Sequence, residues 1–179
     1  MSNHQPTPTM KTILFCLLFA APAVHAKEPT IPNKLIDYPK FLQIALDAAP
    51  IREERRLTEA RFAELAGEPG TIVFDARSAD KYTMRHIKGA VSLPFTDFTA
   101  ESLAKVIPEK TTRVLIYCNN NFRGDPVAFA GKWASASLNI STYIALATYG
   151  YTNIYELGPL LDTRTTKLPF EGTEISGGR

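Results

Sequence analysis

The stretch RVLIYCNNNFRGDP, residues 113–126, decides the fold of this chain. Its first five residues are mostly apolar and predict a buried strand, which ends at Cys118 and is followed by a polar loop. An Ala-rich apolar stretch comes next, and Asp125 with Pro126 at its start predicts a capped helix. This order of strand, loop and helix places Cys118 at the carboxyl end of a strand, where open α/β sheets bind their ligands.

Cys118 is the candidate nucleophile, because a thiolate needs polar surroundings that stabilise its negative charge. Backbone amides, the guanidinium of Arg123 and the amino end of the predicted helix would each provide such stabilisation. The other interpretation is a small apolar thiol packed at a strand end, where buried cysteines are common. The residues predicted to hold an anionic substrate are Asn119, Asn120, Asn121, Phe122, Arg123 and Gly124.

Strand and helix patterns alternate through the rest of the chain, which indicates an α/β protein. The segments predicted as strands are 57–58, 71–75, 90–93, 113–117 and 153–157. The segments predicted as helices are 40–49, 59–66, 100–107, 126 onward and 141–150. Pro50 is expected to close the first helix, and Ser141 to cap the last. We therefore expect a central, mostly parallel five-stranded sheet with helices on both faces.

The amino-terminal residues carry the pattern of a secretory signal peptide. Lys11 begins a short basic region, residues 12–23 are apolar, and Val24-His25-Ala26 is a small-x-small cleavage pattern. We predict cleavage after Ala26 and a periplasmic or secreted mature protein without stable membrane insertion. An uncleaved membrane anchor is the alternative, although the apolar run is short for a spanning helix.

The predicted domain organisation follows from these segments. After the signal peptide at 1–26, an extension with one helix covers 27–52, an α/β domain covers 53–170, and a tail covers 171–179. Cleavage removes Cys16, so the mature chain keeps one cysteine and one histidine, His86. A structural zinc site needs about four ligands, so no metal is expected, and no organic cofactor is implied.

The formal net charge of the whole chain is +2, and its charges are mixed along the sequence. The cluster of Arg52, Arg55 and Arg56 is interrupted by Glu53 and Glu54, which indicates a solvated surface rather than a binding patch. Because the sequence has no basic stripe with interleaved aromatic residues, nucleic-acid binding is not expected.

Three segments, taken in order, resemble the rhodanese-like domain family. The first runs from Val73-Phe74-Asp75-Ala76-Arg77 to His86-Ile87-Lys88-Gly89-Ala90, the second is the strand ending in Cys118, and the third is 150–158. The resemblance implies a three-layer fold. It also implies that the cysteine takes up sulfane sulfur as a persulfide and passes the sulfur to a nucleophile.

The resemblance therefore implies a sulfurtransferase, in which Cys118 carries sulfur from a small anionic donor such as thiosulfate to a thiol or protein acceptor. The loop is longer than usual in the family, and residues 133–139 are extra chain. Both features also suit a catalytically silent module that presents the Cys118 loop to a partner or senses redox state. A phosphatase-like loop would need one residue more than the four between Cys118 and Arg123.

Asp75, Arg77 and His86 are assigned to supporting positions. Asp75 and Arg77 follow a predicted strand, and they either touch substrate or, as the resemblance implies, tie neighbouring loops together. His86 precedes Gly89 and is expected to buttress a turn rather than to take part in catalysis. The sequence leaves the acceptor and the oligomeric state open.

Overall fold

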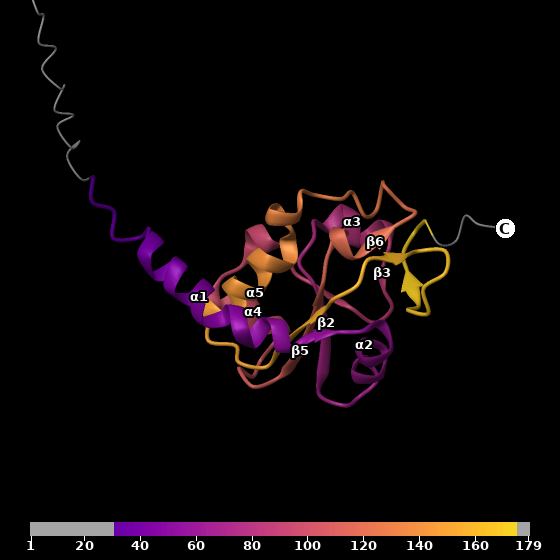
Figure 1. The fold of residues 1–179 in the computed structure, drawn as a ribbon, viewed down its shortest axis with the longest axis horizontal. Coiled ribbons are helices and arrows are strands. Elements are labelled where there is room, and N and C mark those ends of the chain that lie inside the picture. The colour runs from indigo at the N-terminus through magenta and orange to yellow at the C-terminus, as the bar shows by residue number, and fades with distance from the viewer. Residues whose placement is uncertain (1–30, 175–179) are drawn as a thin grey trace, which may run out of the picture. The chain divides into compact units, whose positions relative to one another are not determined.

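The computed structural model describes residues 31–174, which contain a five-stranded parallel sheet (Figure 1). Its strands in spatial order are β1 (Arg56–Leu57), β7 (Ile154–Leu157), β5 (Arg113–Tyr117), β2 (Thr71–Asp75) and β4 (Val91–Ser92). Every neighbouring pair is parallel, and Phe74 lies opposite Ile116 at the centre. The predicted α/β class and five-stranded sheet are confirmed.

Helices cover both faces of this sheet, as predicted. They are α1 (Tyr38–Glu54), α2 (Glu59–Ala66), α3 (Ala79–Met84), α4 (Ala100–Val106) and α5 (Leu138–Thr148). α2 packs on one face, and α1, α4 and α5 pack on the other (Figure 1). Two pairs of short strands lie outside the sheet: β3 (His86–Ile87) with β9 (Phe170–Glu171), and β6 (Phe122–Arg123) with β8 (Leu161–Asp162).

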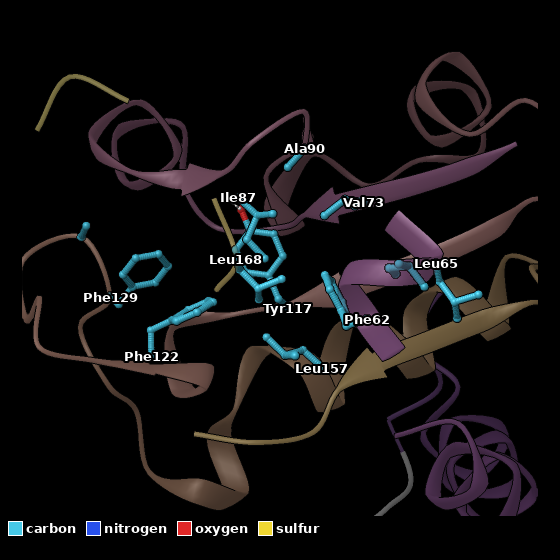
Figure 2. Packing of buried hydrophobic residues seen from close by; sticks show 12 residues of the cluster. Phe62, Leu65, Val73, Ile87, Ala90, Tyr117, Phe122, Phe129, Leu157 and Leu168 are labelled. Atoms are coloured by element: carbon cyan, nitrogen blue, oxygen red, sulfur yellow. Dashed lines mark hydrogen bonds between the residues drawn. The ribbon is translucent and has the colours of Figure 1, made fainter. Parts of the chain in front are cut away.

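The central strand β5 buries alternate residues against opposite helical layers. Leu115 and Tyr117 belong to the cluster that includes Phe62 of α2, which Figure 2 shows from close by. Val114 and Ile116 belong to the second cluster, beneath α4 and α5. A strand covered on both faces needs apolar residues at successive positions, which explains the uninterrupted apolar run in the sequence.

Helix α1 continues through Pro50, where the sequence predicted its end. Proline inside a helix removes a backbone hydrogen bond and disfavours the turn before it. Two interactions offset this cost: α1 packs against α5, and Arg52 in its last turn forms a 2.7 Å ion pair with Glu156 of β7. The helix therefore belongs to the same compact unit as the sheet.

The helix predicted after Asp125 does not form, and residues 126–129 make only a single turn. The backbone carbonyls that would accept helical hydrogen bonds are bound by side chains from distant segments. These bonds run from Arg77 to Ala128, from Lys81 to Val127 and from Asn119 to Ala130. A short 3-10 helix, Ala134–Ala136, comes next, and the following α-helix is α5, which begins at Leu138 and not at the predicted cap, Ser141.

A buried ion pair between Asp75 and Arg77 joins the ends of β2 and β5. Arg77 Nη2 donates to Asp75 Oδ2 at 2.6 Å, and the Tyr117 hydroxyl at the end of β5 donates to the same oxygen. The guanidinium also binds the carbonyls of Ala128 and Arg85. Burial lowers the pKa of Arg77, but the bonds with Asp75 outweigh burial, so the net shift is upward and the group stays charged.

The signal peptide predicted at 1–26 lies outside the described residues. Within residues 31–174, no helix is long and apolar enough to cross a bilayer. The same part of the chain contains no group of three or more histidine, cysteine, aspartate or glutamate side chains that is arranged to hold a metal ion.

We expect Arg77→Met to lower the free energy of unfolding by about 3–5 kcal/mol, because it leaves the Asp75 carboxylate buried without its partner. Urea denaturation measures the change. The control Arg61→Met removes only an exposed ion pair with Glu64, so its midpoint should stay close to that of the wild type. Equal midpoints for Arg77→Met and the wild type would show that the pair does not stabilise this end of the sheet.

Candidate active site

Cys118 follows β5, the middle strand of the sheet, and its side chain is fully buried. It forms no disulfide, and its Sγ lies 3.5 Å from the Oγ of Ser137. Ser137 stands at the amino end of α5, but its hydroxyl makes no capping bond to that helix. The hydroxyl is therefore available to the sulfur, and the positive end of the α5 dipole lies beside it.

Asn121 fixes the backbone around the thiol. Its Oδ1 accepts hydrogen bonds from the backbone N–H of Cys118 at 2.9 Å and from Asn139 Nδ2 at 3.0 Å. Its Nδ2 donates to the carbonyl of Leu157 at 2.6 Å. One amide side chain therefore connects the thiol to the end of β7 and to the first turn of α5.

The other two loop asparagines bind the segment 130–132. Asn119 Nδ2 donates to the carbonyl of Ala130 at 2.7 Å. Asn120 exchanges two hydrogen bonds with the backbone of Lys132, at 2.8 and 3.0 Å. All three asparagine side chains of the loop thus bind other groups of the protein, which fixes the turn after Cys118.

The last three loop residues are the two residues of β6, which pairs with β8, and Gly124 directly after it. Phe122 is buried beside Phe129, with ring centroids 4.6 Å apart (Figure 2). Arg123 is exposed, and its Nε lies 3.7 Å from Asp162. Gly124 has φ of +92°, and a Cβ there would meet Asp162 Oδ1 at 2.9 Å, so this turn requires glycine. These contacts anchor the loop, and the substrate contacts predicted for the three residues stay a prediction.

His86, like Asp75 and Arg77, is bound to neighbouring loops. Its Nδ1 lies 2.8 Å from the carbonyl oxygen of Tyr82, and the two rings stack with centroids 3.8 Å apart. Its Nε2 lies 3.8 Å from Glu171 of β9. These contacts hold the segment between α3 and β4 in place.

Two cavities border the turn that holds the thiol. The larger has a volume of about 660 Å³, and its wall includes Asn119 and Leu138. The smaller has a volume of about 260 Å³, and its wall includes Asn121 and Ser137. Both cavities therefore reach the turn after Cys118 and the start of α5, while the sulfur itself stays buried beneath these residues.

Ser137 and Asn139 belong to this site but are not among the residues predicted from the sequence. Ser137 has the residue type of a helix cap and stands directly before the apolar Leu138, which is the local signal for a helix start. Ser141 carries a similar signal, and only the tertiary structure decides between the two. No local pattern indicates that Asn139 reaches Asn121.

Comparisons with known proteins agree with the fold. The rhodanese-like domain model matches residues 58–158, more than half of the chain. Thiosulfate sulfurtransferase PspE of Escherichia coli K12 is 28% identical over 94 residues, which cover 52% of this chain and 75% of PspE. The structure of the BH2092 protein from Bacillus halodurans has a TM-score of 0.50 at 21% identity, covering 74% of this chain and 88% of that one. The chain belongs to the rhodanese-like domain family.

Proposed function

We propose that this protein is a sulfurtransferase in which Cys118 carries sulfane sulfur as a persulfide. The observation that carries the proposal is the position of Cys118 Sγ at the end of the middle strand, beside the Ser137 hydroxyl and the amino end of α5. Membership of the rhodanese-like family and the similarity to a thiosulfate sulfurtransferase support the same chemistry.

In the first step, the Cys118 thiolate attacks the outer sulfur of a small anionic donor such as thiosulfate. The bond between the two donor sulfurs breaks, its electron pair leaves with sulfite, and the outer sulfur stays on Sγ as a persulfide. Ser137 would donate a hydrogen bond to the negatively charged sulfur, and the dipole of α5 would stabilise that charge. A thiol or protein acceptor then takes the outer sulfur and restores the thiolate.

The burial of the thiol favours a second candidate function. A catalytically silent module would present the Cys118 loop to a partner or respond to redox state without transferring sulfur. Its thiol would stay covered, as Sγ is here, and its loop would be held closed by the bonds of Asn119, Asn120 and Asn121. The two functions differ in reactivity, because only the sulfurtransferase needs a thiolate that a small anion can reach.

We also propose that the protein works after export to the periplasm or the exterior, with residues 1–26 removed. The support is the sequence pattern alone: a basic start, the apolar run at 12–23 and the small residues before the expected cleavage after Ala26.

We expect intact-mass spectrometry of the exported protein to show one added sulfur atom after treatment with thiosulfate. Cyanide should remove this atom, because it attacks the outer sulfur of a persulfide, and the Cys118→Ala variant should never gain it. The mass before treatment also locates the amino end of the mature chain. An unchanged wild-type mass, together with slow alkylation that thiosulfate does not affect, would favour the silent module.

We expect Ser137→Ala to slow the reaction of Cys118 with iodoacetamide by about tenfold or more near neutral pH, since hydrogen bonds to charged groups contribute about 1.5–3 kcal/mol. Ser135→Ala is the matched control, because Ser135 lies in the same short segment but is exposed. Alkylation rates measured under pseudo-first-order conditions distinguish the variants. If Ser137→Ala and the wild type react equally fast, the hydroxyl does not stabilise the thiolate.

A further inference from the structure

The smaller cavity beside the thiol contains buried polar atoms without hydrogen-bond partners in the described part of the chain. Three atoms of residues in its wall are of this kind: Arg52 Nε, Asn139 Oδ1 and Glu156 Oε2. Asn139 and Glu156 are only 3% and 4% exposed. Since a buried polar group without a partner costs about 1–3 kcal/mol, these atoms need bonds that a ligand can supply.

The charges around the cavity restrict the ligand further. Glu156 Oε1 lies 2.7 Å from Arg52 Nη2 and 3.9 Å from Arg56 Nε. Two guanidinium groups and one carboxylate leave the cavity with a formal charge of +1. Burial raises the pKa of Glu156, and Arg52 opposes that rise. A cationic group beside the free Glu156 oxygen would therefore stabilise the carboxylate.

The polar atoms without partners and the net charge of the cavity together define the chemical class of its ligand. Asn139 Oδ1 and Glu156 Oε2 are acceptors, and an ammonium group supplies the N–H donors that they need. Arg52 Nε is a donor, and Arg56 offers a second guanidinium, so a carboxylate suits both. A thiolate that also carries an ammonium and a carboxylate has a net charge of −1, which complements the cavity.

We propose that this cavity is the sulfur-acceptor site and that it binds a small α-amino-acid thiol of the cysteine type. The proposal rests on the sulfurtransferase function proposed above. Ser137 in the cavity wall lies 3.5 Å from Cys118 Sγ, so a thiolate bound against Ser137 would lie one residue away from the sulfur. A volume of about 260 Å³ suits a small metabolite.

The transfer step balances without an external oxidant or reductant. The acceptor thiolate attacks the outer sulfur of the Cys118 persulfide, and a new sulfur–sulfur bond forms. The bond from the outer sulfur to Sγ breaks, and its electron pair stays on Sγ as a thiolate. The acceptor leaves as a persulfide, and Cys118 is ready for the next donor.

Calorimetric titration of the mature Cys118→Ala protein measures acceptor binding without any sulfur chemistry. Cysteine, kept reduced by a phosphine, should bind at one saturable site. Cysteamine lacks the carboxylate and 3-mercaptopropionate lacks the ammonium group, so each should bind about tenfold more weakly or worse.

Variants in the same Cys118→Ala background assign the contacts. Glu156→Gln should weaken the binding of cysteine about tenfold but should not weaken the binding of 3-mercaptopropionate, since it removes the partner of the ammonium group. Glu64→Gln makes the same substitution at an exposed ion pair on α2 and is the matched control. Arg56 lies on the edge strand β1. Its substitution Arg56→Ala should weaken the binding of cysteine and of 3-mercaptopropionate, which carry a carboxylate, but not the binding of cysteamine. It tests the site even if Glu156→Gln fails to fold.

The absence of saturable binding, or equal binding of the three thiols, would overturn the acceptor site whether or not the wild type forms a persulfide. The site would be supported if cysteine binds more tightly than the other two thiols and if Glu156→Gln or Arg56→Ala weakens that binding as stated. If that selectivity is found and the wild type forms no persulfide, the site stands as an amino-thiol site and the proposed sulfurtransferase function fails.

Discussion

The buried guanidinium of Arg77 holds together the end of the sheet at which the thiol lies. It pairs with Asp75, the last residue of β2. Asp75 in turn accepts a hydrogen bond from the hydroxyl of Tyr117, the residue directly before Cys118. The same guanidinium binds the carbonyls of Ala128 and Arg85. Because removing one member of such a pair leaves an uncompensated charge in the interior, these segments depend on one another for their positions.

The connection from Cys118 to α5 is long and largely irregular, and side chains from elsewhere satisfy its backbone. Lys81, Asn119 and Asn120 bind carbonyls at Val127, Ala130 and Lys132, in addition to the bond from Arg77. Backbone groups outside helices and sheets need such partners. After this segment α5 begins at Leu138, and Ser137 directly before it lies 3.5 Å from the sulfur.

The sheet could be predicted from the sequence because its strands are apolar runs of the right length, such as the one that ends at Cys118. The position of the thiol follows from the same pattern. The helix after Asp125 was wrongly predicted, because its cap signal is local whereas the competing bonds come from Arg77 and Lys81, about 50 residues away. The functions of the loop asparagines and the smaller cavity also depend on contacts between distant segments, which local patterns do not encode.

A crystal structure of the mature protein after exposure to thiosulfate would show directly whether Cys118 accepts sulfur. Sulfur transfer to Cys118 predicts one additional sulfur atom bonded to its Sγ, close to Ser137 and the amino end of α5. An unmodified thiol that remains covered by Ser137, in crystals saturated with thiosulfate, would contradict the claim that Cys118 carries sulfur from this class of donor.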